Sequence, residues 1–279
     1  PVVSIKKVQS QQKQAIAQEA AELPEAPDIT DLVRRAIVKN TITLAYQPVV
    51  RSKNPSKIAF YEGLIRVPDD AGKIIPAAQF IDRIERNSLG RMVDCCALQA
   101  GLAELTAQPW LRLSINASPL SIVDPLWQAT LRYGLEEDAR LAERLIIEVT
   151  ETTEVTDMAQ FAQDVNAVRQ QGVSFALDDF GAGYTSFRII KEVRFDIIKI
   201  DGHFIRDIHT NRDNQALTKV LIDIAGHFEM MAVADAVEKQ EEMAFLRDMN
   251  VDCQQGYLFG RPEVTPIWAD KTKVVGLPG

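Results

Sequence analysis

The chain has 279 residues, a formal net charge of -8 and 46% hydrophobic residues. This length suits one large domain with an appendage, and the hydrophobic content can supply a full core. The negative charge argues against a general DNA- or RNA-binding surface, and no apolar run reaches the roughly 18 residues needed to span a bilayer. The three cysteines lack the spacing of metal ligands or disulfide partners, which indicates buried thiols in a reducing compartment.

Residues 1–28 are predicted to form an appendage to the domain. They are rich in Ala, Gln and Glu, and Pro24 and Pro27 interrupt them. Two interpretations stay open: a solvated tail or frayed helix, and the end of a coiled coil. Because the first residue is Pro1 rather than Met, we expect this sequence to be a fragment of a longer protein. A signalling or membrane-anchoring domain upstream is compatible with this expectation.

Strand-like and helix-like segments alternate through residues 29–266, the predicted barrel domain. Eight apolar runs resemble strands: residues 43–50, 58–67, 111–116, 145–149, 173–179, 196–201, 230–235 and 251–259. Helical periodicity occurs in residues 29–40, 76–87, 92–105, 158–172, 216–228 and 238–250. This alternation predicts an α/β fold with a parallel sheet, and eight repeats favour a TIM-type (β/α)8 barrel. Residues 267–279 are predicted to be a C-terminal tail with a short helix near Trp268.

Polar side chains recur at the downstream ends of the apolar runs. They are Gln47, Glu62, Asn116, Glu148, Asp178, Asp179, Lys199, Asp201, Asp235 and Gln255. In a TIM barrel the C-terminal strand ends converge on one mouth, where active sites lie. At least five carboxylates should therefore meet there, and such a cluster repels itself unless cations occupy it.

The segment LDDFGAGYTS carries two adjacent aspartates, Asp178 and Asp179. Because strand side chains alternate, we expect the strand to end where both face one site, with Asp178 bridging two ions and Asp179 binding one. Gly181 and Gly183 would allow a tight loop. Alone, this pattern is equally typical of a surface turn. Oxygen ligands without Cys or His favour Mg²⁺ or Mn²⁺, with Ca²⁺ as a non-productive occupant.

Two neighbouring metal ions suit phosphoester hydrolysis, since they activate water and stabilise the leaving oxygen. Lys199 would add positive charge near the attacking water or the phosphoryl oxygens. Arg66, four residues after Glu62, could grip a phosphate, although a surface arginine would show the same spacing.

Eight motifs occur in an order that resembles the EAL domain family of bacterial cyclic-di-GMP phosphodiesterases and their catalytically inactive relatives. They are YQPVV, EGLIR, SINAS, IEVTET, DDFGAGYTS, IKID, ADAVEK and QGYLFGRP, over roughly residues 30–264. The resemblance implies a TIM-type barrel with one antiparallel strand. It also implies Mg²⁺- or Mn²⁺-dependent cleavage of cyclic-di-GMP to linear pGpG, and it is compatible with a homodimer. Reduced cysteines and a cytosolic nucleotide predict a cytoplasmic location, with which tethering at the cytoplasmic face of the inner membrane is equally compatible.

The resemblance also implies roles for individual residues. Glu62, Asn116, Glu148 and Asp178 match the ligands of a first metal, and Asp178, Asp179 and Asp235 those of a second. Lys199 matches a lysine near the nucleophilic water, so Glu62, Lys199 and Asp235 are the expected catalytic residues. Gln47, Leu64, Arg66, Glu238 and Gln255 match positions around the substrate, Asp201 a polar position beside Lys199, and Glu151 a glutamate that steadies the loop after Asp179.

Three residues depart from the family pattern. Gly63 replaces an alanine, and we expect little effect. Asp235 stands where a longer glutamate normally reaches the second metal; one methylene less withdraws the carboxylate by about 1.3 Å, and a misplacement of this order can cost about 100-fold in rate. Ala236 replaces a glycine and would be strained if the backbone φ is positive there.

Two functions therefore remain open at this point. The domain is either a working phosphodiesterase that is slowed at the second metal, or a cyclic-di-GMP receptor that binds without useful turnover. A barrel that has lost both properties is a third reading. A lyase or aldolase on a similar barrel would need a Schiff-base lysine or another base, and the ordered motifs argue against it.

Overall fold

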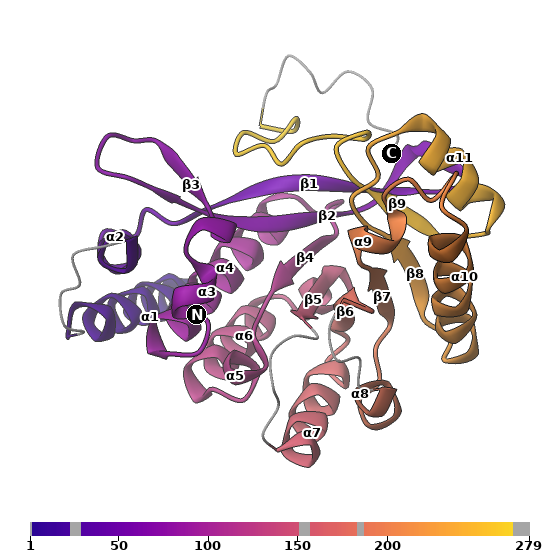
Figure 1. Ribbon diagram of the computed structural model, residues 1–279. Coiled ribbons are helices and arrows are strands. Elements are labelled where there is room, and N and C mark those ends of the chain that lie inside the picture. The colour runs from indigo at the N-terminus through magenta and orange to yellow at the C-terminus, as the bar shows by residue number, and fades with distance from the viewer. Residues whose placement is uncertain (1, 23–28, 151–156, 183–186, 270–279) are drawn as a thin grey trace.

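The computed structural model describes residues 2–22, 29–150, 157–182 and 187–269. Within these residues, nine strands form one sheet in the order β1-β9-β8-β7-β6-β5-β4-β2-β3, and an additional pairing of β1 with β2 closes eight of them into a barrel (Figure 1). The strands are β1 Thr43–Arg51, β2 Asn54–Pro68, β3 Ile74–Pro76, β4 Leu113–Asn116, β5 Leu145–Thr150, β6 Ser174–Phe180, β7 Ile197–Ile200, β8 Met231–Ala234 and β9 Cys253–Gln255. All eight predicted strands are present.

Helices separate most of these strands and cover the outside of the barrel (Figure 1). They are α1 Val2–Glu22, α2 Ile29–Val38, α3 Ile81–Ile84, α4 Ser88–Ala107, α5 Pro119–Ile122, α6 Pro125–Glu137, α7 Met158–Arg169, α8 Phe187–Glu192, α9 Gly202–Ile205, α10 Arg212–His227 and α11 Gln240–Asp248, with the 3₁₀ helices η1 Ala77–Gln79 and η2 Ala139–Arg144. None of the described helices combines the length and apolar character needed to cross a membrane.

Strand β1 is antiparallel to both of its neighbours, β2 and β9, whereas the other adjacent strands of the barrel are parallel. Only Ser52 and Lys53 separate β1 from β2, and a parallel connection needs about a dozen or more residues. Chain length alone therefore imposes a hairpin. The expected single antiparallel strand is confirmed.

Strand β3 was not expected and lies outside the barrel, paired with the end of β2. The sequence pattern predicted one helix over residues 76–87. Instead, Pro76 ends β3, and two short helical segments, η1 and α3, follow it. Proline fits both positions, because its fixed φ suits an edge strand as well as a first helical turn.

The barrel interior consists of two layers that lie two residues apart on each strand. The lower layer is apolar and holds Val49, Phe60, Ile146, Ala176, Ile197, Val233 and Cys253, one residue from each of seven strands. Two residues further toward the mouth, six of these strands carry Glu62, Glu148, Asp178, Lys199, Asp235 and Gln255; on antiparallel β1 the equivalent step leads back to Gln47. The period of two along a strand thus brings these polar side chains to one level.

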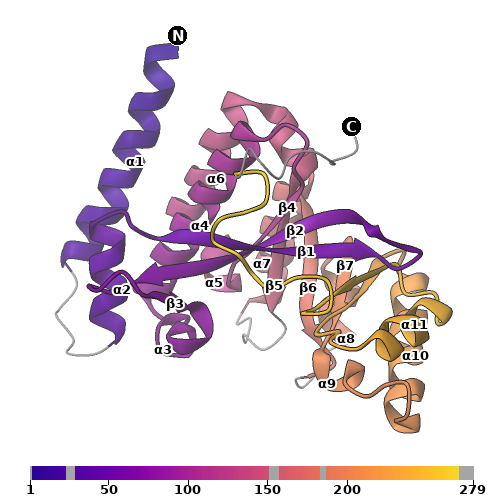
Figure 2. The same ribbon diagram turned by 90° about the horizontal axis from the view of Figure 1, so that it is seen from above.

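Helix α1 packs against α2, α4 and α6 beside the barrel (Figure 2). Its side chains Ile16 and Ala20 are buried and belong to the main hydrophobic core, together with Val33 and Ile37 of α2. The described part of the predicted appendage is therefore a packed helix rather than a solvated tail. Residues 23–28 lie outside the described part of the chain.

The outer face of the β1–β2 hairpin is covered by the C-terminal segment, which runs across these strands in Figure 2. The backbone of Glu263 pairs with that of Tyr46, and the buried ring of Trp268 meets Tyr46 and Tyr61 edge-on, at centroid distances of 5.1 and 4.7 Å. Its indole Nε1 donates to Glu104 at 2.6 Å. A hairpin lacks the crossover helix that covers other strands, and this segment takes its place. The predicted tail thus begins as packed structure; residues 270–279 lie outside the described part.

Replacing Trp268 by Ala should lower the free energy of unfolding by about 3–5 kcal/mol, because a large buried aromatic ring is lost. Trp110 is a matched control: its ring also contacts Trp268, yet it is 48% exposed, so Trp110→Ala should cost about 1 kcal/mol or less. Urea denaturation of the two variants measures both values. Equal losses would contradict the assigned role of Trp268.

Candidate metal centre at the barrel mouth

The polar layer opens into a pocket of about 440 Å³ at the mouth of the barrel. Among the residues predicted from the sequence, its lining includes Gln47, Glu62, Leu64, Asn116, Asp178, Asp179, Lys199, Asp235 and Gln255. Glu148 lies directly beneath, in contact with Lys199. The geometry therefore brings together six carboxylate and amide side chains, expected as metal ligands, around one buried lysine.

Three carboxylates form the centre of this group. Oxygen atoms of Glu62, Glu148 and Asp178 all lie within 4.8 Å of one another. Glu62 and Glu148 are buried, and Glu148 Oε1 has no hydrogen-bond partner among the described residues. Asn116 Nδ2 donates to Glu62 Oε1 at 2.8 Å. A buried carboxylate oxygen without a donor is costly, so a divalent cation fits this group.

In the described part of the chain, the three carboxylates share the ammonium group of Lys199. Its Nζ lies 2.7 Å from Glu148, 3.1 Å from Glu62 and 3.3 Å from Asp178. Burial favours the neutral amine, but the surrounding carboxylates outweigh it and raise the pKa of Lys199 well above its usual value. Lys199 therefore stays charged and neutralises only part of the cluster.

The remaining charge is distributed unevenly over the carboxylates. Burial alone would raise the pKa of Glu62, but Lys199 and the amides of Gln255 and Asn116 lower it. Burial and the nearby Glu62 charge raise the pKa of Glu148 well above its usual range, and burial also raises that of Asp178. Without a second cation, the excess negative charge of the carboxylates is reduced by bound protons. A metal ion that binds there would displace these protons.

A bulge in β6 turns Asp178 and Asp179 toward the same site. Three residue steps from Leu177 to Phe180 oppose two steps on β7, and Asp179 has φ 56°. The strand was expected to end at these aspartates; it continues to Phe180, and the bulge performs the turn instead. Burial and the charge of Asp178 raise the pKa of Asp179 to about 6. Gly183 of the following loop lies outside the described residues.

Asp235 lines the pocket, but its carboxylate is hydrogen-bonded to the backbone of the next residue. Its Oδ1 accepts from the backbone N–H of Ala236 at 2.6 Å. Burial, with the charges of Asp178 and Glu62, raises the pKa of Asp235 to about 7 against the opposing effect of Lys199. The shorter side chain thus uses a backbone donor in its own turn.

The expected strain at Ala236 is confirmed, because its φ is 56°. Its methyl group lies against Gly202, where an added Cβ would come within 2.6 Å of it. Gly63, the other departure from the family pattern, lies beside Ile115, whose Cδ1 would be 2.8 Å from an added Cβ. The absence of a Cβ at Gly63 therefore leaves space for the side chain of Ile115.

The remaining predicted substrate residues divide into two groups. Gln255 Nε2 donates to Glu62 at 2.5 Å and to Gln47 Oε1 at 3.2 Å, so the Gln255 amide links Gln47 to the carboxylate of Glu62. Arg66, Asp201 and Glu238 do not line the pocket. Arg66 Nη1 donates to the carbonyl of Ile65, Asp201 caps α9, and Glu238 is exposed before α11. Glu151 lies outside the described residues.

Sequence reasoning missed one buried acid of this pocket, Asp94 on α4. Its Oδ2 accepts from the Ser118 backbone at 2.9 Å and from Ser121 Oγ at 2.6 Å. Burial raises the pKa of Asp94 to about 6 despite these donors. The available signal was an aspartate on the otherwise apolar face of a periodic helix.

Comparison with known proteins agrees with this geometry. Residues 31–262 match the family described as EAL domain. A curated relative, the cyclic di-GMP phosphodiesterase PdeB of Shewanella oneidensis, is 30% identical over 245 residues, which cover 85% of this chain and 28% of that protein. The chain therefore spans less than a third of this relative's length.

Solved structures show the same fold. An EAL domain protein of Listeria monocytogenes superposes with a TM-score of 0.76 at 27% identity, over 90% of this chain and 98% of that one. A standalone EAL protein of Vibrio cholerae in its c-di-GMP-bound form gives a TM-score of 0.69 at 26% identity, over 80% and 92%. The chain belongs to the EAL domain family.

The contact between Gly202 and Ala236 can be tested by a double-mutant cycle. Ala236→Gly should stabilise the protein by about 1 kcal/mol, because glycine tolerates a positive φ. Gly202→Ala should destabilise wild-type protein but cost less when combined with Ala236→Gly, with a coupling of about 1–2 kcal/mol. Chemical denaturation of the four proteins gives this coupling; additive effects would mean that the two residues do not collide.

Proposed function

We propose that this EAL domain is a divalent-metal-dependent phosphodiesterase that hydrolyses cyclic-di-GMP to linear pGpG, with turnover weakened at the second metal position. The observation that carries this proposal is the buried group of Glu62, Glu148 and Asp178, with its unpaired Glu148 oxygen, beneath an open pocket. The names of relatives such as PdeB support the substrate and reaction.

The oxygen-rich site fits Mg²⁺ or Mn²⁺, and Ca²⁺ as a non-productive occupant. Glu62, Asn116, Glu148 and Asp178 would hold a first ion, and Asp178, Asp179 and Asp235 a second. When bound, such ions would polarise the phosphodiester and lower the pKa of a water molecule.

The chain's own residues would contribute charge and proton transfer. Lys199 keeps its proton, so its ammonium group can stabilise negative charge on the phosphoryl oxygens. Asp235 lines the pocket, so its carboxylate would hold the second ion or accept a proton from the attacking water. Gln47 and Gln255 form part of the polar lining of the pocket, and Leu64 would offer an apolar surface to the nucleotide.

The second candidate function is a cyclic-di-GMP receptor with impaired catalysis. The hydrogen bond from Ala236 N–H to Asp235 favours it, because this bond must be given up or shared when Asp235 serves the second metal position. Binding through the remaining ligands would persist in such a protein.

We further propose that the protein acts on a cytosolic nucleotide, in the cytoplasm or at the cytoplasmic face of the inner membrane. A homodimer is part of this proposal. Helix α10 exposes Leu217 and Val220 by 48% and 54%, and a second copy could cover these apolar side chains.

Product analysis separates the two functions. Purified protein incubated with Mn²⁺ and cyclic-di-GMP should release pGpG, and Asp235→Glu should raise the rate by about 10- to 100-fold, because the carboxylate regains one methylene of reach. Glu148→Gln is the control and should abolish product. Nucleotide binding without product in both wild type and Asp235→Glu would establish the receptor instead.

The raised carboxyl pKa values predict how stability depends on pH. The folded protein holds protons on Asp235 and Asp179 up to about pH 7 and 6, whereas the unfolded chain releases them near pH 4. The folded state thus binds more protons in this window, so stability should fall as pH rises through it. The metal-free protein should melt several degrees lower at about pH 8 than at about pH 5.

Thermal melts of Asp235→Asn provide the control for this pH effect. The variant should lose part of the pH dependence, because its amide does not titrate. Mn²⁺ should raise the melting temperature of wild type more at the higher pH, since fewer protons compete for the ligands. A melting temperature that rises with pH in metal-free wild type would contradict the assignment.

A further inference from the structure

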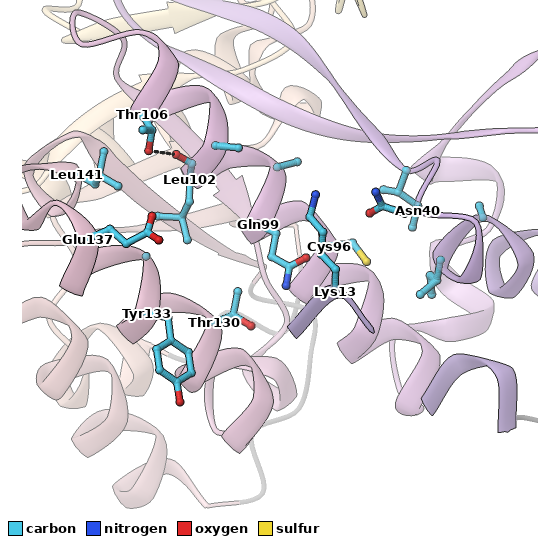
Figure 3. A pocket seen from close by; sticks show the side chains of 16 residues that line it. Lys13, Asn40, Cys96, Gln99, Leu102, Thr106, Thr130, Tyr133, Glu137 and Leu141 are labelled. Atoms are coloured by element: carbon cyan, nitrogen blue, oxygen red, sulfur yellow. Dashed lines mark hydrogen bonds between the residues drawn. The ribbon is translucent and has the colours of Figure 1, made fainter. Parts of the chain in front are cut away.

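A second cavity, of about 180 Å³, lies between the N-terminal helices α1 and α2 and the barrel helices α4 and α6 (Figure 3). It is separate from the mouth pocket and shares no lining residue with it. Ile37, Ile42, Leu102 and Leu141 give it apolar walls. A cavity of about 150 Å³ can bind benzene, so a space of this size can hold a small organic molecule.

One end of the cavity offers hydrogen-bond donors. Gln99 Nε2 is buried and has no partner among the described residues, and Lys13 brings an ammonium group from α1. Burial raises the pKa of the Cys96 thiol to about 12, and the charge of Lys13 opposes that rise, so Lys13 lies close to Cys96. Figure 3 shows Lys13, Cys96 and Gln99 grouped on one side.

The acidic group of the cavity lies at the other end. Glu137 belongs to α6, and Figure 3 shows it beside Leu141, away from Lys13. Burial raises the pKa of Glu137. A ligand with an anionic acceptor at one end and an apolar body therefore fits in one orientation, with its charge at Lys13 and Gln99.

Helix α4 connects this cavity to the mouth pocket. Val93, Asp94 and Ala97 line the mouth pocket, whereas Cys96, Gln99 and Ala100 line the cavity. With 3.6 residues per turn, the two sets occupy adjoining faces of one helix. A molecule wedged between α1 and α4 would favour one position of α4 and hence of Asp94.

We propose that the cavity between α1 and α4 is a regulatory site for a small amphipathic carboxylate, which binds through Lys13 and Gln99 and alters nucleotide binding at the barrel mouth. The regulatory half of this proposal rests on the proposed function. The binding half stands without it.

Calorimetry with benzoate and hexanoate tests the binding half. Both should bind the wild-type chain, and Lys13→Met and Gln99→Leu should each weaken binding at least tenfold. Benzyl alcohol and hexanol, which lack the charge, should bind more weakly than the acids. Lys39→Met is the matched control, since Lys39 is exposed on the neighbouring turn outside the cavity, and it should leave affinity unchanged.

Ala103→Leu provides a second variant that does not depend on the donors. Ala103 lines the cavity, so a larger side chain should fill it and prevent binding, while unchanged far-ultraviolet circular dichroism shows that the chain folds. No binding of either acid at millimolar concentration would overturn the site. Binding that survives Lys13→Met, Gln99→Leu and Ala103→Leu would overturn it as well.

The regulatory half is tested by measuring cyclic-di-GMP affinity with and without saturating benzoate or hexanoate. A change of threefold or more, absent in Lys13→Met, is expected. Acid binding with an unchanged nucleotide affinity would overturn the coupling. If the chain binds no cyclic-di-GMP at all, the proposed function fails, and the calorimetry still decides the carboxylate site.

Discussion

The mouth of this barrel depends on one electrostatic constraint: among the described residues, five carboxylates share a largely buried space with the ammonium group of Lys199. Lys199 contacts three of them and keeps its charge, yet it cannot balance the rest. Burial and mutual repulsion therefore raise the pKa values of Glu148, Asp179 and Asp235 above those of the unfolded chain. The close-packed apolar layer below belongs to the same strands that carry these groups and holds those strands together. Cation binding is thus favoured, because folding brings these carboxylates together against their mutual repulsion and a bound cation relieves that repulsion.

Much of this arrangement could be predicted from the sequence, because the period of two along each strand determines it. Residues two apart on a strand face the same side of the sheet. Ile146 and Glu148, like Ile197 and Lys199, therefore both point into the barrel, with the polar residue nearer the mouth. The antiparallel course of β1 could also have been inferred from the seven residues between the first two predicted runs, 43–50 and 58–67, which are too few for a parallel connection. The short strand β3 was missed, because three residues on an edge have almost no periodicity.

Other details required coordinates. The bulge at Asp179 inserts one residue without any change in apolar pattern, so the strand was expected to end there. The backbone bond of Asp235 follows from a local turn whose positive φ at Ala236 could be suspected but not established. Asp94 was overlooked because helical periodicity alone does not tell which buried face of α4 borders the mouth. Arg66 was proposed from its spacing after Glu62 as well as from the resemblance, but its Nη1 donates to the carbonyl of Ile65. Glu238 was placed by the resemblance alone, and it is exposed before α11.

The pairing of β1 with β9 has a consequence for how the molecule is made. Val49 and Gln255 are partners although about two hundred residues separate them, and Glu263 adds to the same edge. A nascent chain leaving the ribosome therefore carries β1 with one unpaired edge until β9 has also emerged. The cylinder can close only after β9 has been synthesised. Chaperones that shield exposed strand edges would act on this domain during that interval.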